Sequence, residues 1–426
     1  MNERQTAFQI LNRIERGNAY SNLVLDAQLK QSGSADGSAF ITALVYGVTE
    51  RKITLDYILA SFLRQPIKKL RPEVLTVLRM GVYQLQYMDK IPESAAVNES
   101  VKLVKKNGCA YAAGLVNSVL RKAAARETDY PDKSDFIKYL SIRYSCPPSL
   151  VSHYIHDYGE ENAEGILASS VGAAPTVLRV NTLKTDTAHL QETLEMQGIA
   201  TECGMLENTL VVKSGGAISA CKAYADGLFH VQDFASAYCV QALDLQPGHI
   251  LADVCAAPGG KTFTAAQMMQ NQGKIYAFDL YPQRVNLIAD GARRLGISIV
   301  EASVHDAAEA FPKLQGKADR VLCDVPCSGL GTIRRKPEIR YKDLSFVDNL
   351  TELQYNILIN TSKILKAGGI LVYSTCTLNR AENEAVCERF LEKNADFERI
   401  CDYRTLLPHK DGTDGFFFAR LRRKEN

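Results

Sequence analysis

The sequence lacks the features that mark membrane, secreted and repeat proteins. No apolar run in its 426 residues approaches the roughly 18 residues that a membrane-spanning helix needs. Residues 1–5 begin an amphipathic helix and show no signal-peptide core. Internal repeats and low-complexity tracts are also absent. We therefore expect a cytoplasmic protein that has no membrane partner and, from its length, about two or three domains.

The chain also lacks the cysteine spacing of a disulfide scaffold or a zinc site. Its eleven cysteines are an odd number and are dispersed without a regular framework, which argues against disulfides. Cys323 and Cys327 have a loose ligand spacing, but a second pair with matching spacing is missing. We expect no bound metal.

Charge is nearly balanced overall, at +2, but it is unevenly spread. Residues 1–130 carry 18 Lys plus Arg against 12 Asp plus Glu, and the remainder is slightly acidic. A basic N-terminal third indicates a polyanionic partner such as a nucleic acid. The candidates for its charged face are Tyr46, Arg51, Lys52, Lys68, Lys69, Arg71, Lys105 and Lys106.

The N-terminal third has the apolar spacing of helices. Expected helices begin near Ala7 and near Leu23, Leu25 and Leu29, and then cover Ala39–Arg51, Ile53–Phe62, Pro72–Gln86, Ser94–Lys105 and Leu115–Ala125. The polar segment 126–134 contains proline and is typical of a linker. Residues 135–235 mix helices (137–144, 148–158, 187–197) with strands (176–181, 210–212, 227–231). That mixture indicates a small α+β module.

From residue 236 onward, short apolar strands alternate with helices. Expected strands are 249–254, 274–279, 298–301, 320–323 and 369–374, and expected helices are 262–269, 282–295, 344–365 and 381–394. Such alternation is typical of a doubly wound, mostly parallel sheet. The chain is thus expected to be multidomain, with an all-α domain (1–130), a small α+β middle module (135–235) and a C-terminal Rossmann-like α/β domain (236–426).

The loop from Asp253 to Thr262 follows the first strand of this sheet, at the edge where such sheets bind ligands. Its small residues let a ligand approach the backbone, and the next helix offers free N–H groups. A nucleotide-triphosphate loop is disfavoured because Cys255 stands where that motif needs glycine. Asp279, after the second strand, suits ribose hydroxyls, and Asp306, after the third, suits an adenine amino group. This geometry fits S-adenosylmethionine.

Two cysteines at strand ends point to covalent chemistry. Cys327 lies in Asp324-Val325-Pro326-Cys327-Ser328-Gly329, and Cys376 lies in Tyr373-Ser374-Thr375-Cys376-Thr377. Cytosine carbon 5 is a poor nucleophile, but thiolate addition at carbon 6 activates it toward a methyl donor. The thiolate needs nearby positive charge, for which Lys261 is the candidate. The chemistry alone does not decide which cysteine attacks.

These motifs make the resemblance specific. The chain resembles the Sun/Fmu (RsmB-type) family of bacterial ribosomal RNA cytosine-5 methyltransferases. The matching segments are Arg179–Thr182, Asp253–Thr262, Asp279, Asp324–Gly329, Ser374–Thr377 and Gly412–Phe417. The N-terminal third is similar to the NusB-like RNA-binding domain that this subfamily carries.

The resemblance implies roles for individual residues. Cys376 would be the nucleophile, Cys327 would assist resolution of the adduct, and Asp324 would contact the pyrimidine and the cofactor end of the site. The cofactor pocket would comprise Cys255, Ala256, Ala257, Pro258, Gly259, Gly260, Lys261, Asp279, Arg284, Asp306 and Asp324. The substrate would be 16S ribosomal RNA before full ribosome assembly, bound by a monomer.

Three alternatives remain open. In DNA cytosine methyltransferases the nucleophile follows a proline, a context that would make Cys327 the attacker. A non-catalytic RNA-binding assembly factor is disfavoured by the intact set of Cys327, Cys376 and Asp324. A methyltransferase acting on an exocyclic nitrogen would have a second proline and an aromatic residue where this chain has Cys327. For attack of a thiol on carbon 6, the target base must leave its stack, which costs least in a single-stranded loop.

Overall fold

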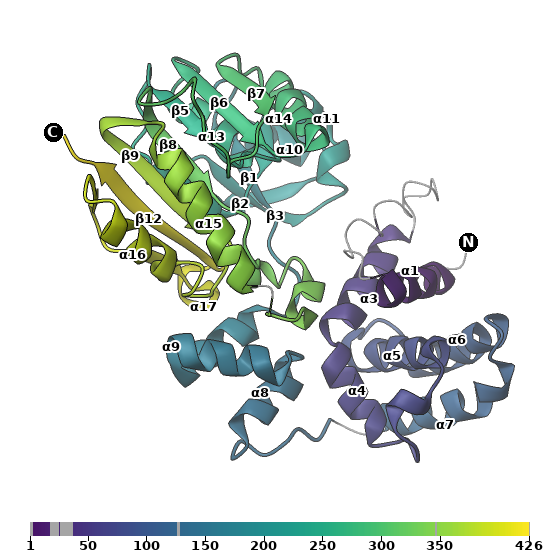
Figure 1. Cartoon of the computed structure of the whole chain (residues 1–426). Helices are drawn as coiled ribbons and strands as arrows, with labels where there is room; N and C mark the ends of the chain where they lie inside the picture. The colour runs from purple at the N-terminus through teal and green to yellow at the C-terminus, as the bar shows by residue number, and fades with distance from the viewer. Residues whose placement is uncertain (1–2, 18–24, 26–36, 126–127, 346, 426) are drawn as a thin grey trace. The chain divides into compact units, whose positions relative to one another are not determined.

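The computed structural model describes residues 3–17, 25, 37–125, 128–345 and 347–425. Its chain divides into two compact units (Figure 1). The first comprises Met1–Ala173 with Ile333–Lys342, and the second comprises Ala174–Thr332 with Asp343–Asn426. The helix expected near Leu23, Leu25 and Leu29 falls almost wholly outside the described residues.

The first unit is helical throughout its described residues, as the apolar spacing predicted. Its α-helices are α1 (Glu3–Gly17), α3 (Ser38–Glu50), α4 (Lys52–Ala60), α5 (Pro72–Tyr87), α6 (Glu93–Lys106), α7 (Ala113–Ala124), α8 (Phe136–Tyr144) and α9 (Pro148–Ser169). Short 3-10 turns are η1 (Ile67–Lys69), η2 (Ala110–Ala112) and η5 (Pro337–Tyr341). Leu44, Leu55 and Val77 are fully buried in one core shared by α1 and α3 to α7.

The first unit also includes a segment from the C-terminal half of the sequence, Ile333–Lys342. Arg340, in η5, is fully buried and donates to three backbone carbonyls: Glu50 O (3.2 Å), Tyr144 O (3.0 Å) and Ser170 O (2.9 Å). These carbonyls lie at the C-terminal ends of α3, α8 and α9. Helix C-termini carry unpaired carbonyls and partial negative charge. One guanidinium therefore serves three helix ends at once.

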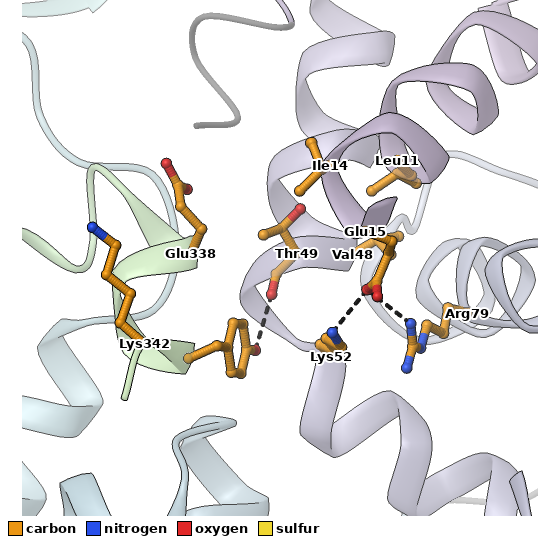
Figure 2. A pocket seen from close by; sticks show the side chains of 10 residues that line it. Leu11, Ile14, Glu15, Val48, Thr49, Lys52, Arg79, Glu338 and Lys342 are labelled. Carbon is orange, nitrogen blue, oxygen red and sulfur yellow. Dashed lines mark hydrogen bonds and ion pairs between the residues drawn. The ribbon is translucent and has the colours of Figure 1, made fainter. Parts of the chain in front are cut away.

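The neighbouring pocket is lined by the same segment and by α1, α3, α4 and α5. Figure 2 shows Glu338 and Lys342 on one side and Glu15, Lys52 and Arg79 on the other. Glu15 pairs with both Lys52 (2.8 Å) and Arg79 (3.1 Å). Lys52, a candidate for the charged face, is thus engaged inside the unit.

Replacing Arg340 with alanine is expected to destabilise the protein by about 2 to 4 kcal/mol, because three buried carbonyls lose charge-assisted donors. The measurement is the midpoint of thermal or urea unfolding. Lys336→Ala is the control, since Lys336 is exposed in the same segment and its loss should leave the midpoint unchanged. Equal midpoints for both variants would contradict this role of Arg340.

The second unit begins with a four-stranded antiparallel sheet. Its order is β2-β3-β1-β4, from β1 (Val177–Val180), β2 (Ala200–Cys203), β3 (Thr209–Ser214) and β4 (Phe229–Val231), with helices α10 (Thr187–Met196) and α11 (Lys222–Ala225) and the 3-10 turn η3 (Ile218–Ala220). The expected strands correspond to β1, β3 and β4, whereas β2 was not predicted.

Asn181 ties this small sheet to the rest of the unit. It is fully buried, and its Nδ2 donates to Gly227 O and Leu295 O, both at 2.8 Å. Leu295 ends a helix of the larger sheet, α14 (Pro282–Leu295). The segment Arg179–Thr182, one of those that carry the resemblance, therefore joins two parts of the fold.

The large sheet has the order β10-β12-β9-β8-β5-β6-β7, with β11 paired to β12. Strands β5 (Ile250–Asp253), β6 (Lys274–Asp279), β7 (Val300–Val304), β8 (Ala318–Asp324) and β9 (Leu365–Thr375) are parallel neighbours. Strands β10 (Phe397–Arg399), β11 (Arg404–Leu406) and β12 (Phe416–Arg423) pair antiparallel. The expected doubly wound, mostly parallel sheet is confirmed.

Helices cover both faces of this sheet (Figure 1). α12 (Phe234–Gln241), α13 (Gly260–Met268) and α14 contribute to one core, and α15 (Val347–Ser362) and α16 (Glu384–Lys393) contribute to another. The 3-10 turn η4 (Leu330–Thr332) and helix α17 (Pro408–Asp411) complete the unit. Leu251 packs in the first core and its neighbour Ala252 in the second, as strand alternation requires. No helix in the described ranges is both long and apolar enough to span a bilayer.

Candidate active site

The cofactor loop joins β5 to α13, as the sequence predicted. Asp253 is buried at the end of β5, and its Oδ2 accepts a hydrogen bond from Thr262 Oγ1 (2.6 Å). Gly259 has a φ of +110°, and a Cβ there would lie 2.3 Å from the Phe263 ring. Only glycine fits this position, so the loop can turn tightly into the N-terminus of α13.

Two further acids follow the adjacent strands β6 and β7. Asp279 is buried at the end of β6, and Asp306 is exposed just after β7. Arg284 lies 3.4 Å from Asp279 Oδ2 and donates to Ala257 O (3.0 Å), so it joins the second strand end to the cofactor loop. Carboxylates at neighbouring strand ends are suitable acceptors for the ribose hydroxyls and the adenine amino group of S-adenosylmethionine. The residues present fit that cofactor.

The carboxyl group of Asp253 has a raised pKa. Burial raises the pKa of Asp253 to about 7, and the nearby Asp324 charge adds to this, against the lowering effect of the Thr262 hydrogen bond. The folded pKa thus lies above the unfolded value, so the folded state binds the proton more tightly. The stabilising contribution is present below about pH 4 and is lost as the pH rises toward 7.

Asp253→Asn mimics the protonated acid and should remove this dependence. The variant is expected to gain stability relative to the parent as pH rises from 4 to 8, by up to about 4 kcal/mol. The measurement is the difference between the two unfolding midpoints across that range, which cancels other titrating groups. A difference that does not change with pH would show that Asp253 titrates normally.

The two cysteines meet at the carboxyl ends of β8 and β9. Asp324 pairs with Ser374 in the parallel register, and Val325 N and Gly331 N donate to Ser374 O (3.1 Å) and Cys376 O (3.0 Å). This pairing brings Cys327 Sγ to 3.2 Å from Cys376 Sγ, and neither cysteine is in a disulfide.

The motif Gly412–Phe417, near the C-terminus, contacts the segment that follows Cys327. Gly415 N donates to Gly331 O (2.9 Å), and a Cβ on Gly331 would lie 1.9 Å from Gly415 O. Glycine at 331 therefore lets the two backbones touch beside the cysteines.

Asp324 and Lys261 form a partly buried ion pair beside the cysteines. Lys261 Nζ donates to Asp324 Oδ2 (2.7 Å), and Ser374 Oγ donates to Asp324 Oδ1 (2.8 Å). Burial works against the Lys261 charge, but the Asp324 carboxylate raises the pKa of Lys261, and a Cys376 thiolate would raise it further. Lys261 therefore stays a cation, within electrostatic reach of Cys376, as expected for the group that favours a thiolate.

The Cys327 thiol has a raised pKa. The hydrogen bond to Cys376 raises the pKa of Cys327 well above its usual range, and burial and the Cys376 charge add to this. The raised pKa favours the protonated form of Cys327, and at 3.2 Å either sulfur can donate to the other. This arrangement favours Cys376 as the thiolate.

Sequence reasoning missed Glu382, a fully buried acid behind the cysteines. It accepts hydrogen bonds from Ser328, Gln354 and Asn379. The sequence predicts a helix over 381–394, and an acid in the first turn of a helix is favourable because of the helix dipole. Glu382 therefore gives no separate signal of a site in the sequence. Among the described residues, no group of three His, Cys, Asp or Glu side chains is placed to hold a metal.

The fold and this site define an S-adenosylmethionine-dependent methyltransferase. Residues 240–422 match the family described as 16S rRNA methyltransferase RsmB/F. Residues 1–125 match the NusB family, and residues 146–219 match the ferredoxin-like domain of RsmF/B-like methyltransferases.

Relatives match along the whole chain. The probable ribosomal RNA small subunit methyltransferase B of Bacillus subtilis (strain 168) is 37% identical, covering 99% of this chain and 98% of its own. Its counterpart from Synechocystis sp. is 36% identical, covering 99% of both chains. The crystal structure of PH0851 aligns with a TM-score of 0.81 at 26% identity, covering 98% of each chain.

The chain belongs to the RsmB/F family of 16S rRNA methyltransferases, with an N-terminal NusB domain, and it is an S-adenosylmethionine-dependent 16S rRNA cytosine methyltransferase. The resemblance and the cofactor inferred from the sequence are thereby confirmed.

Proposed function

We propose that the enzyme methylates carbon 5 of one cytosine in 16S rRNA through a covalent bond between Cys376 and carbon 6. The observation that carries this assignment is the sulfur pair, 3.2 Å apart at the carboxyl edge of the sheet. The Lys261–Asp324 ion pair supports Cys376 as the attacking thiolate, and so does the raised pKa of Cys327, whose first cause is its hydrogen bond with Cys376.

The proposed reaction begins with the Cys376 thiolate. The Cys376 sulfur bonds to carbon 6, and the electron pair of the 5,6 double bond becomes available at carbon 5. S-adenosylmethionine, held by residues 255–261, Asp279, Arg284 and Asp306, supplies an electrophilic methyl group when bound. Loss of the carbon-5 proton to a base then restores the double bond and expels the Cys376 thiolate. Cys327, next to the leaving sulfur, assists this release.

Asp324 has a defined place in this scheme. Its carboxylate is fixed by Lys261 and Ser374, which leaves it oriented at the strand end where the pyrimidine must enter. A carboxylate held there accepts hydrogen bonds from the exocyclic amine of cytosine. We assign Asp324 to recognition of the target base.

We further propose that residues 1–130 bind RNA, that 135–235 form the middle module and that 236–426 carry catalysis. Five candidates for the basic face are exposed: Lys68, Lys69, Arg71, Lys105 and Lys106. Their charges suit phosphate contacts, which position a protein without reading sequence. The protein would act in the cytoplasm, as a monomer, on RNA before full assembly of the subunit.

The test is methyl transfer in vitro to protein-free 16S rRNA and to assembled small subunits, followed by bisulfite sequencing of the RNA. The proposal expects one new protected cytosine, formed faster on free RNA. Methylation confined to an exocyclic nitrogen, or none with the cofactor present, would refute the proposed chemistry. Faster reaction on assembled subunits would refute only the assembly stage.

A further inference from the structure

Glu382 is a buried carboxylate whose four hydrogen-bond donors are all neutral. Oε2 accepts from Ser328 N (2.8 Å) and Gln354 Nε2 (3.0 Å). Oε1 accepts from Ser328 Oγ (2.5 Å) and Asn379 Nδ2 (3.0 Å). Its side chain is 0% exposed, and none of these partners is a cation. A carboxylate in such a place is costly unless its acceptor sites are filled, as they are here.

The partners of Glu382 come from both cysteine-bearing turns. Ser328 directly follows Cys327, and Thr377 directly follows Cys376. Ser328 Oγ lies 2.7 Å from Thr377 Oγ1. Because Ser328 gives its only hydroxyl proton to Glu382, Thr377 must donate to Ser328. A chain of hydrogen bonds therefore runs from the Cys376 turn through the Cys327 turn to the buried acid.

Other contacts hold Glu382 itself in place. Tyr373 OH, on β9, donates to Glu382 O (2.7 Å), and Gln354 Nε2, on α15, also donates to Pro326 O (2.9 Å). Glu382 and Gln354 together thus connect β9, α15 and the turn at Pro326. Its negative charge also acts on Cys327, where it is one of the lesser causes that raise the pKa of that thiol.

We propose that Glu382 is a positioning residue that locks the Cys327 turn against the Cys376 turn, so that the two sulfurs are held in contact. This inference rests on the proposed function, because it assigns Cys376 the attack and Cys327 the release. Glu382 itself lies behind the cysteines and touches neither substrate nor cofactor.

The test compares Glu382→Gln with Glu388→Gln, an exposed glutamate on α16. The Glu382→Gln change would place an amide N–H against at least one existing donor, so the lock should loosen. We expect kcat to fall about 10- to 100-fold, with the KM values for RNA and cofactor unchanged. The pH profile of kcat should shift as well, and a fraction of the enzyme should remain covalently bound to RNA. Glu388→Gln should behave as the parent enzyme.

A second variant, Ser328→Ala, keeps the inference testable if Glu382→Gln does not fold. Ser328→Ala removes one hydroxyl donor and the link to Thr377 but leaves Glu382 and the backbone bond in place. It should show the same defect, several-fold smaller. If Glu382→Gln unfolds below the assay temperature, the test rests on Ser328→Ala. An unchanged kcat and pH profile in Ser328→Ala would overturn the inference.

The proposed function and the role of Glu382 can fail separately. RNA containing 5-fluorocytidine at the target position should trap the parent enzyme, since the fluorine cannot leave as a proton does. No trapped parent enzyme would refute the proposed function. A trapped parent, together with a Glu382→Gln variant whose kcat, pH profile and adduct level match the parent, would refute only the role of Glu382.

Discussion

Cys376→Ala is expected to lower methyl transfer to 16S rRNA by at least about 1000-fold, with RNA binding unchanged. Removal of a covalent nucleophile leaves only positioning and electrostatic effects to accelerate the reaction. Carbon 5 of cytosine gains electron density from the adduct at carbon 6, and the raised pKa of Cys327 disfavours the thiolate that would replace Cys376 in forming it. The measurement is the initial rate of transfer of a labelled methyl group at saturating cofactor.

Cys401→Ala is the matched control for this loss, since Cys401 is exposed in the same unit. It should retain the parent rate. If Cys376→Ala kept activity while Cys327→Ala lost it, the nucleophile would be Cys327, as in the Pro-Cys arrangement of DNA enzymes.

Cys327→Ala is expected to give the opposite phenotype, an enzyme that begins the reaction but fails to finish it. The Cys376 thiolate loses the proton donor that lies 3.2 Å away, so release of the sulfur from carbon 6 slows. A protein–RNA complex that survives denaturing electrophoresis should accumulate to a large fraction of the enzyme, and turnover should fall at least tenfold.

The double variant with both cysteines replaced by alanine is the control for that complex. It should form none, because the bond requires the Cys376 sulfur. Normal turnover of Cys327→Ala, without any stable complex, would remove Cys327 from the mechanism.

The parallel core of the sheet could be predicted because its strands are continuous apolar segments with helices between them. The antiparallel strands could not. β12 (Phe416–Arg423) pairs with β9, some 45 residues earlier in the chain, and its first residues were recognised only as a motif. β2 is an exposed edge strand with little apolar patterning. Pairing over long distances, rather than local propensity, places both strands.

The candidate site residues that lie at the ends of strands could be predicted from the sequence. Cys327, Cys376 and Asp324 come together because β8 and β9 are parallel neighbours, and parallel strands end at the same edge. The Lys261–Asp324 contact needed the tertiary structure, since 63 residues separate the partners.

Three charged residues have partners that only the packing reveals. Arg334 donates to the Ala173 carbonyl (2.7 Å). Arg340, a few residues later, is buried against helix ends. Glu382 looked like an ordinary acid at a helix start. In each case the sequence shows the charge but not its partner.

The central claim is that Cys376 bonds to the target cytosine. The most direct measurement is peptide mapping by mass spectrometry after reaction of the parent enzyme with S-adenosylmethionine and RNA that carries 5-fluorocytidine. The account predicts a single modified peptide, with a methylated fluorocytidine adduct on Cys376. An adduct on Cys327, or a methylated product with no adduct on either cysteine, would contradict it.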